Sequence, residues 1–185
     1  MMKRLPMLFF GGRDSFTFMH YDIDLANIFH FHFEGTKEVI LFPQSENRYL
    51  YKVPHSLITH ESIDFSNPDF SQWPALRYSN GYKTHLNHGE LLYMPEGYWH
   101  YMRYRSPGFS MSLRALARNP RNLSRALYNV FVMRYYDNLM RRVRGQQWID
   151  WKNEKAIERT HQNLPVAIQL GRENRRLGDA ADFPE

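Results

Sequence analysis

Two short runs of the chain carry side chains that can bind a metal ion. The first run is His20-Tyr21-Asp22, and the second ends in His100. Alternate residues of a β-strand project to the same face, so His20 and Asp22 are predicted to point the same way. With a third ligand from a distant strand, two imidazoles and one carboxylate hold Fe(II) by three corners and leave three corners open. The pattern therefore predicts an iron site made of His20, Asp22 and His100.

The segment before His100 is expected to fix the direction of this ligand. It reads Gly89, five residues, Pro95-x-Gly97, two residues and His100. Proline sets its own φ and glycine permits a positive φ, so the two residues define a tight turn between two strands. We expect this turn to aim His100 at the first motif. The spacing resembles the second sequence signature of the cupins.

Most of residues 1–117 are typical of short β-strands. The run from Asn27 to Phe33 alternates between one face with Asn27, Phe29 and Phe31 and another with His30 and His32. Residues 44–80 are rich in Asn, Ser, Asp and Pro and are predicted to form a long functional loop. Many short strands with Gly and Pro turns predict a β-sandwich or barrel. The other predicted strands are 5–10, 15–22, 37–42, 89–94, 99–105 and 109–116.

The pattern changes to a helical one after Asn119. This asparagine can cap a helix that has Pro120 at its first position and ends at Gly145. A second helix is predicted over 150–163, and the tail after Gly171 is expected to be loosely ordered. The apolar residues of the first helix spread over more than one face, so one barrel wall cannot cover them and a second copy of the chain is predicted to do so. The two apolar sets are Leu123, Leu127, Val130, Phe131, Tyr135 and Leu139, and Val132, Tyr136, Met140 and Val143.

Length and composition exclude several classes of protein. A chain of 185 residues with 43% hydrophobic residues is long and apolar enough for one domain with its own core. It has no cysteine, which excludes disulfides, a thiolate metal site and a cysteine nucleophile. No apolar run reaches the length of a membrane span, and the first ten residues lack a signal-peptide pattern. We therefore expect a cytoplasmic protein.

The net charge of +5 is concentrated in the helical segment. Residues 1–117 have 11 basic and 11 acidic side chains, whereas residues 118–185 have 13 basic and 8 acidic ones. Between residues 118 and 144, seven arginines accompany a single acid, Asp137. Such a stretch permits a nucleic-acid partner. No set of base-stacking aromatic residues accompanies it, so a solvated helix face is the favoured interpretation.

Together the motifs are similar to the cupin-like JmjC oxygenases, and most similar to the asparaginyl-hydroxylase branch that includes factor inhibiting HIF. The resemblance covers about residues 5–117. It implies a mainly β fold, a double-stranded β-helix or jelly roll over residues 1–117, followed by C-terminal α-helices and a tail over 118–185 that form a homodimer. The runs that carry it are His20-Tyr21-Asp22, Asn27, Gly35-Thr36-Lys37, Leu41-Phe42-Pro43, Asn67-Pro68-Asp69-Phe70, Leu92-Tyr93-Met94-Pro95 and Tyr98-Trp99-His100.

The resemblance also implies an activity and a set of site residues. The implied enzyme is an Fe(II)- and 2-oxoglutarate-dependent dioxygenase that hydroxylates a polypeptide or small-molecule substrate. Its iron ligands map onto His20, Asp22 and His100. Its co-substrate residues map onto Lys37, which pairs with the distal carboxylate, onto Thr17, which helps to hold that carboxylate, and onto Asn27, which lines the site. Phe29 and Phe31 share the strand face of Asn27 and are expected to form a dry wall.

Three departures from the family pattern and several alternatives accompany this hypothesis. Thr17-Phe18 stands where the branch often has Thr-Pro, so the turn into the first motif is expected to differ. Arg114 stands where the branch has an asparagine near the iron, and it is expected to shift the co-substrate or to read an anionic substrate. The chain begins about one strand before the first motif, so either a shortened homologue or a fragment is expected. One alternative is a cupin-fold metal-binding protein without turnover. Another is a cupin enzyme that uses His30 and His32 as ligands and has no need of 2-oxoglutarate or of Lys37.

Overall fold

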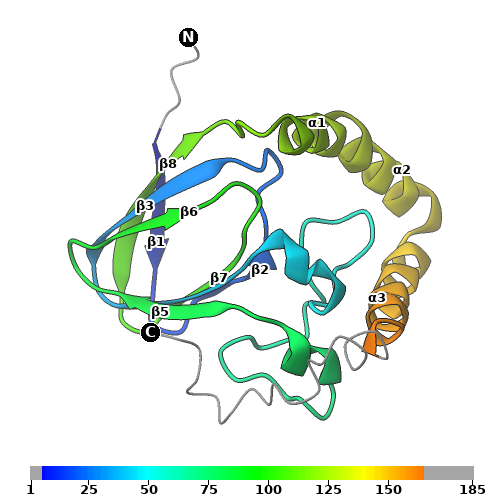
Figure 1. Ribbon diagram of the computed structural model, residues 1–185, viewed down its shortest axis with the longest axis horizontal. Helices are drawn as coiled ribbons and strands as arrows, with labels where there is room; N and C mark the ends of the chain where they lie inside the picture. The colour runs from blue at the N-terminus through cyan, green and yellow to red at the C-terminus, as the bar shows by residue number, and fades with distance from the viewer. Residues whose placement is uncertain (1–5, 165–185) are drawn as a thin grey trace.

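The computed structural model describes residues 6–164, which form two antiparallel sheets followed by helices (Figure 1). The first sheet has the strand order β1-β8-β3-β6 and the second has the order β2-β7-β4-β5. Two facing four-stranded sheets confirm the predicted jelly roll. The strands are β1 (Met7–Gly11), β2 (Phe16–His20), β3 (Asn27–Glu34), β4 (Lys37–Phe42), β5 (Tyr82–Leu86), β6 (Leu91–Met94), β7 (Trp99–Tyr104) and β8 (Gly108–Ala115).

The seven strands predicted from apolar runs all form, and the structure adds one more. The additional strand, β5, pairs antiparallel with β4, so that Lys37 lies opposite Leu86 and Leu41 lies opposite Tyr82. Its sequence mixes a tyrosine, a lysine, a threonine and a histidine, and it has a single buried residue, Leu86. An edge strand needs little apolar surface because only one of its sides pairs with another strand, and this explains why the hydrophobic pattern did not reveal it.

The interior of the first sheet is polar at its centre. Along β3, the buried residues are Ile28, His30 and His32, which point between the two sheets. Phe29 lies on the outer face with 40% of its side chain exposed, and Phe31 shares that face. The expectation that Phe29 and Phe31 wall the site is therefore wrong. The pairing of β3 between β6 and β8 sets which face looks inward, and this register is not visible in the sequence of β3 alone.

The second sheet is covered on both faces at its inner strand β4. All six residues of β4 are buried, with one side facing the first sheet and the other facing residues 44–80. This long segment contains two 3-10 helices, η1 (Gln44–Arg48) and η2 (Pro74–Tyr78), and it supplies a large part of the main core. It is thus a packed layer rather than an open loop. Its most deeply buried side chains are Tyr49, Leu50, Tyr51, Trp73, Ala75 and Leu76.

The C-terminal helices form an arc along one side of the sheets (Figure 1). They are α1 (Pro120–Tyr128), the π-helical segment η3 (Asn129–Met133), α2 (Arg134–Arg144) and α3 (Gln146–His161). The Asn119 side chain accepts a hydrogen bond from the backbone N–H of Arg121, and Gly145 ends α2 with a φ of 52°, so the predicted cap and end are confirmed. The second helix begins four residues before its predicted start. The predicted tail after Gly171 lies outside the described residues.

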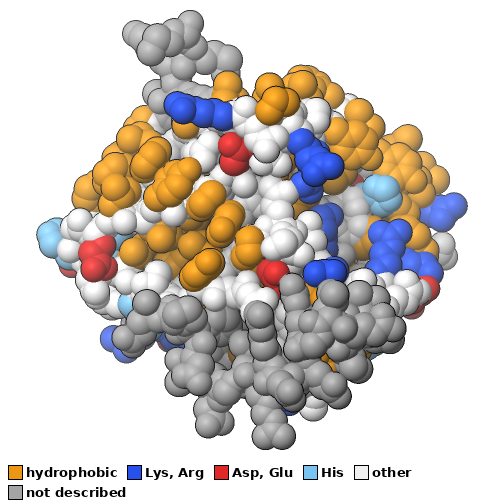
Figure 2. All heavy atoms as spheres, in the orientation of Figure 1, with side chains coloured by type: hydrophobic (Ala, Val, Ile, Leu, Met, Phe, Trp, Pro, Cys, Tyr) orange, Lys and Arg blue, Asp and Glu red, His pale blue; other side chains and the backbone are white. Residues whose placement is uncertain are grey.

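Many apolar side chains of the helices remain exposed within one chain. The helix α2 has no buried residue, and Phe131 and Tyr135 are 65% and 67% exposed. Figure 2 shows hydrophobic side chains gathered over the first sheet and along the helices. Most members of both apolar sets predicted for this segment are therefore exposed in the monomer, although Tyr136 packs against Trp148 of α3. No helix within residues 6–164 combines the length and the apolar character needed to cross a bilayer.

Candidate metal centre

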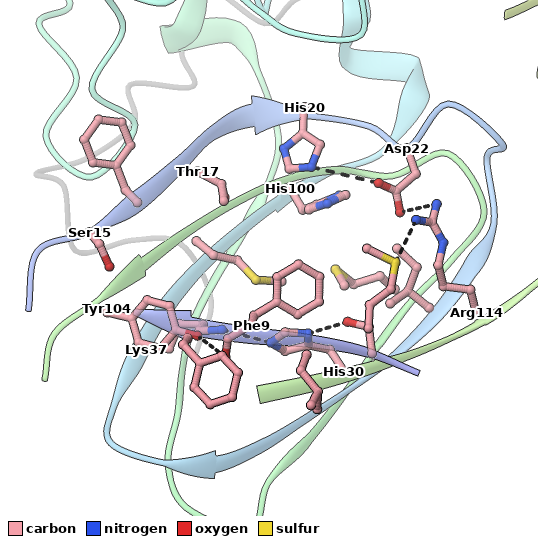
Figure 3. A pocket seen from close by; sticks show the side chains of 18 residues that line it. Phe9, Ser15, Thr17, His20, Asp22, His30, Lys37, His100, Tyr104 and Arg114 are labelled. Carbon is pink, nitrogen blue, oxygen red and sulfur yellow. Dashed lines mark hydrogen bonds and ion pairs between the residues drawn. The ribbon is translucent and has the colours of Figure 1, made fainter. Parts of the chain in front are cut away.

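The three predicted metal ligands meet at one place in the structure. His20 and His100 lie directly opposite each other in the pairing of β2 with β7, and their ring centroids are 4.1 Å apart. Asp22 follows the end of β2, with Oδ1 3.9 Å from Nε2 of His20. One ligand atom from each residue lies within 4.8 Å of the others, close to the spacing of about 4 Å or less that a shared ion imposes. Figure 3 shows all three side chains on one side of a cavity.

A β-bulge in β2 brings His20 opposite His100. Thr17 pairs with Met102 and His20 pairs with His100, so three steps along β2 match two steps along β7. Without the additional residue, Met19 would stand opposite His100 and His20 would be displaced along the strand. Bulges of this kind re-aim side chains next to functional sites. Regular alternation alone, on which the sequence prediction relied, does not contain this irregularity.

Each imidazole is held with its Nε2 atom free to bind a metal. Nδ1 of His20 donates to the backbone carbonyl of Phe18 at 2.7 Å, and Nδ1 of His100 donates to the carbonyl of Tyr98 at 3.2 Å. A carbonyl can only accept, so the proton of each neutral ring is on Nδ1 and the lone pair is on Nε2. Such contacts fix the tautomer and the orientation of metal-binding histidines.

The electrostatics of the site also favour ligation. Burial lowers the pKa of His100 to about 3, with smaller contributions from His20 and Arg114. His100 is therefore neutral at physiological pH, as a metal ligand must be. Two imidazoles and one carboxylate, already gathered around one point, fit the donor set of a three-cornered Fe(II) site.

Arg114 binds the far side of the ligand carboxylate. Its guanidinium nitrogen Nη2 lies 2.9 Å from Oδ2 of Asp22 and also pairs with Asp24. Oδ1 of Asp22 remains directed at the histidines. Arg114 is thus placed beside the metal ligands, as its position in the sequence predicts, and it orients Asp22 from 92 residues further along the chain.

The turn before His100 has the predicted form. The backbone N–H of Tyr98 donates to the carbonyl of Pro95 at 3.2 Å, and Gly97 has a φ of +72°. A Cβ atom at Gly97 would approach the side-chain Nε2 atom of Gln44 to 1.7 Å, so the Gln44 side chain would have to move, and the positive φ favours glycine in addition. The turn ends two residues before His100 and sets the start of β7.

A cavity of about 460 Å³ extends from the three ligands into the jelly roll. Thr17 and Lys37 line it, as predicted for residues that hold a co-substrate. Asn27 is not among the lining residues. It lies on the outer face of β3, where its Oδ1 accepts a hydrogen bond from the hydroxyl of Tyr93 at 2.7 Å. The structure therefore brings together five of the six predicted site residues, and His30 takes the inward place on β3 that was assigned to Asn27.

Lys37 lies on the side of the cavity opposite the metal ligands (Figure 3). It is 1% exposed, and its Nζ atom donates to Nε2 of His30 at 3.0 Å and to Oγ of Ser110 at 2.8 Å. The ammonium also lies 4.2 Å from the centroid of the Tyr104 ring. Burial lowers the pKa of Lys37 to about 8, so most of the lysine is charged at pH 7. In the described part of the chain, no carboxylate forms an ion pair with it.

The two histidines of the alternative metal site are engaged as hydrogen-bonding groups. Nδ1 of His30 contacts Oγ of Ser112 at 2.8 Å, and its Nε2 accepts from Lys37. Nε2 of His32 donates to the carbonyl of Gly35 at 3.0 Å, which leaves its Nδ1 to accept from Ser110 at 2.8 Å. All four ring nitrogens have partners, and the rings support Lys37. This arrangement disfavours His30 and His32 as metal ligands.

Sequence reasoning missed the serines and the tyrosine that complete this network. Ser110 and Ser112 alternate on β8 with the same spacing as His30 and His32 on β3, and the two pairs face each other in the ladder. Two serines at i and i+2 opposite two histidines are a recognisable signal once the pairing of the strands is known. Tyr104, paired with Lys37 across β7 and β4, needs the same information.

Comparisons with known proteins identify the family of the chain. A family model described as a cupin-like domain matches residues 3–142. JmjC domain-containing protein D of Dictyostelium discoideum is 32% identical over 103 residues, which cover 55% of this chain and 22% of that protein. Jumonji C domain-containing protein 5 of Drosophila melanogaster is 34% identical over 108 residues, covering 55% and 25%. Lysine-specific demethylase JMJ31 of Arabidopsis thaliana is 33% identical over 70 residues, covering 36% and 13%.

The chain spans about a quarter or less of the length of these curated relatives. The match to the family model, by contrast, extends over most of the chain and contains every residue of the candidate metal centre. The similarity to several JmjC proteins confirms the resemblance drawn from the motifs, without singling out the asparaginyl-hydroxylase branch. This chain belongs to the cupin-like domain family, with JmjC domain-containing proteins among its relatives.

Proposed function

We propose that the protein is an Fe(II)- and 2-oxoglutarate-dependent oxygenase that hydroxylates a side chain of a protein or small-molecule substrate. His20, Asp22 and His100 would hold the metal, and Lys37 and Thr17 would hold the co-substrate. When bound, Fe(II) with dioxygen and 2-oxoglutarate supplies the oxidation of a C–H bond. The JmjC relatives support this class of reaction, and the substrate is open.

The observation that carries the proposal is the buried charge of Lys37. A buried ammonium is unfavourable unless an anion accompanies it. The partners of Lys37 are the neutral ring of His30, the hydroxyl of Ser110 and the ring face of Tyr104. Two of its three N–H groups have acceptors, which leaves one N–H for a ligand. A dicarboxylate that binds the metal at one end and Lys37 at the other would supply the missing negative charge.

The surrounding residues would orient this ligand and exclude water. Thr17 and Ser15 line the same cavity as Lys37 and offer hydroxyl donors to a carboxylate. Phe9, Ile28 and Met94 supply apolar walls, which strengthen the interaction between Lys37 and an anion by lowering the local dielectric. The Arg114 contact keeps Asp22 turned toward the histidines. These roles require no change in the fold.

Calorimetry with the inert analogue N-oxalylglycine tests the proposal. The wild-type chain loaded with Mn(II) should bind the analogue, and Lys37→Ala should weaken binding by about ten- to a hundredfold because a charge-assisted hydrogen bond is lost. The control is Lys155→Ala, which removes a partly exposed lysine that pairs with Glu158 on α3. Unchanged affinity in Lys37→Ala would show that Lys37 does not anchor the ligand.

A second measurement separates an enzyme from a protein that only binds. Purified protein with Fe(II) and dioxygen should convert 2-oxoglutarate into succinate. Binding of N-oxalylglycine without any succinate would favour the cupin-fold binding protein without turnover. Turnover of another substrate without any need for 2-oxoglutarate would favour a different class of cupin enzyme.

A further inference from the structure

A second cavity of about 510 Å³ reaches the same metal centre. His20, Asp22 and Arg114 line both this cavity and the one that contains Lys37. The second cavity contains neither Lys37 nor Thr17 among its lining residues. The metal ligands thus form a wall shared by two compartments, one of which has the features proposed for the co-substrate. The other compartment leaves a separate approach to the metal.

The second compartment lies between the jelly roll and the helical segment. One wall comes from His55, Leu57 and their neighbours in the long segment between β4 and β5. The opposite wall comes from Met133 at the end of η3 and from Arg134 at the start of α2. On the face shown in Figure 2, Lys and Arg side chains gather where the surface is hollowed between the sheets and the helices.

The acidic groups of this compartment are already neutralised. Asp137 lines it, but its Oδ1 accepts from Nζ of Lys152 at 2.7 Å and from Trp148, and its Oδ2 accepts from Arg141 at 2.8 Å. The carboxylate of Asp22 is paired with Arg114. Neither carboxylate is therefore available as the partner of a cationic substrate.

Arg134 is the exception to this pairing. In the part of the chain that the structure describes, it lines the compartment and has no ion pair or hydrogen bond from its guanidinium. Its charge adds to those of Arg114, Arg141 and Lys152, which together outnumber the neighbouring carboxylates. Five N–H donors in a planar fork match the geometry of a planar, two-oxygen anion such as a carboxylate.

We propose that this second compartment receives the substrate and that Arg134 binds a carboxylate which the substrate carries near the oxidised carbon. This inference rests on the proposed oxygenase function. Leu57 and Met133 would contact the aliphatic part of the substrate, and the metal would face the carbon to be oxidised. The substrate is therefore taken to be an amino-acid unit with a recognised carboxylate, which is either the acidic side chain of a residue in a polypeptide or the α-carboxylate of a free amino acid.

The test uses Mn(II)-loaded protein saturated with N-oxalylglycine. Paramagnetic Mn(II) broadens the NMR lines of any molecule that binds close to it. The probes are the acetylated amides of aspartate and glutamate, their neutral counterparts asparagine and glutamine, and the four free amino acids. Selective broadening of the acetylated amides of aspartate and glutamate would identify an acidic side chain as the recognised group. Equal broadening of all four free amino acids, with no broadening of the acetylated amides, would identify the α-carboxylate as the recognised group.

Two variants of the same helix make the test specific. Arg134→Gln should weaken binding of the broadened probe by about three- to tenfold, a modest effect because the side chain is exposed. Arg142→Gln removes the same charge from α2 at a position that does not line the compartment, and it should bind the probe as the wild type does. Equal losses in both variants would overturn the proposal in favour of a general effect of helix charge.

The outcomes separate this inference from the proposed function. Absence of Mn(II) or N-oxalylglycine binding, measured before any probe is added, would contradict the oxygenase function itself. Normal binding of both, with no preference for anionic probes over neutral ones, would overturn only the substrate inference. Arg134→Glu provides a further check, because it should lose the anionic probe while N-oxalylglycine binding stays unchanged.

Discussion

The Nζ atom of Lys37 lies 3.0 Å from Nε2 of His30 inside the jelly roll, and the lysine is the donor. Burial, with a smaller effect of Lys37, lowers the pKa of His30 to about 3, so the imidazole stays neutral beside the ammonium. The pair therefore has a single charge, which belongs to Lys37. Protonation of this lysine should control both the stability of the fold and the affinity for an anion.

The stability contributed by Lys37 should increase with pH between about 8 and 10.4. The pKa of Lys37 is lowered to about 8, whereas that of an unfolded lysine is about 10.4. The unfolded chain therefore binds more protons in this window, so the free energy of unfolding rises as the pH rises through it. Below pH 8 both states are protonated, and a penalty of roughly 3 kcal/mol for the buried charge persists.

Urea denaturation of the wild type and of Lys37→Met measures this effect. The free energy of unfolding of the wild type should gain up to about 3 kcal/mol relative to the variant between pH 7 and pH 10. The comparison cancels most other titrating groups, and Lys155→Met, which changes a partly exposed lysine outside the cavity, should show no such trend. A constant difference across this range would mean that Lys37 titrates normally.

Anion binding should have the opposite pH dependence. N-oxalylglycine needs the charged form of Lys37, so its affinity should fall as the pH rises above about 8. Binding near pH 8.5 should also take up protons, which calorimetry in two buffers of different ionisation enthalpy detects. Lys37→Arg keeps the charge at every pH and should bind without proton uptake. Proton release by the wild type would contradict the assigned role.

Metal binding should depend on Asp22 and be insensitive to the neighbouring histidine pair. Asp22→Ala removes the carboxylate ligand and should weaken Mn(II) binding, followed by electron paramagnetic resonance, by more than about a hundredfold. His32→Ala should leave Mn(II) affinity close to that of the wild type, because both nitrogens of His32 have hydrogen-bond partners. The reverse result, in which Asp22→Ala keeps its Mn(II) affinity and His32→Ala loses it, would favour His30 and His32 as the metal ligands.

The turn before His100 offers a matched pair of glycines. Gly97 and Gly89 both have positive φ, +72° and +83°, but a Cβ atom would clash only at Gly97. Each alanine variant should lose about 1–2 kcal/mol of stability for the backbone conformation. Gly97→Ala should lose more than Gly89→Ala in thermal denaturation, and it alone should weaken metal binding by moving His100. Similar losses and unchanged metal affinity in both variants would show that the turn does not aim the ligand.

The exposed apolar stripes of the helical segment support a homodimer, which we propose as the state of the chain in solution. The exposed fractions are 65% for Phe131, 57% for Leu139 and 70% for Val143. A contiguous row of exposed apolar side chains is uncommon on the surface of monomeric proteins. Phe131→Arg should yield monomers or aggregates in light scattering. Tyr82→Arg, a change at a 53% exposed residue of the edge strand β5, should leave the assembly unchanged. A wild-type chain that is monomeric at micromolar concentration would contradict the proposal.

The sequence by itself determined the parts of the site that depend on local chemistry. The spacing of His20, Asp22 and His100 identified the ligands, and the Pro95–Gly97 turn identified what aims the last of them. Likewise, Asn119 marked the start of the helical segment, because an N-cap and a following proline act on the residues next to them. Such signals are complete within a few residues of the chain.

Only the tertiary structure decided which face of β3 looks inward. Alternation divides β3 into two faces, but the inward face depends on the register with β6 and β8, which are about 60 to 80 residues away. The sequence favoured Asn27 and the phenylalanines, because apolar residues are expected inside. The structure instead places His30 inside, since Ser112 and Lys37 satisfy its polar atoms there.

The bulge in β2 and the contact of Arg114 with Asp22 have the same origin. A bulge is defined by the partner strand, because it is a mismatch in the count of paired residues. The Arg114 contact joins residues 92 positions apart and exists only after β8 has closed the first sheet. Local sequence therefore specified the ligands, while the packing of the two sheets specified their alignment and the lone buried charge of Lys37 across the cavity.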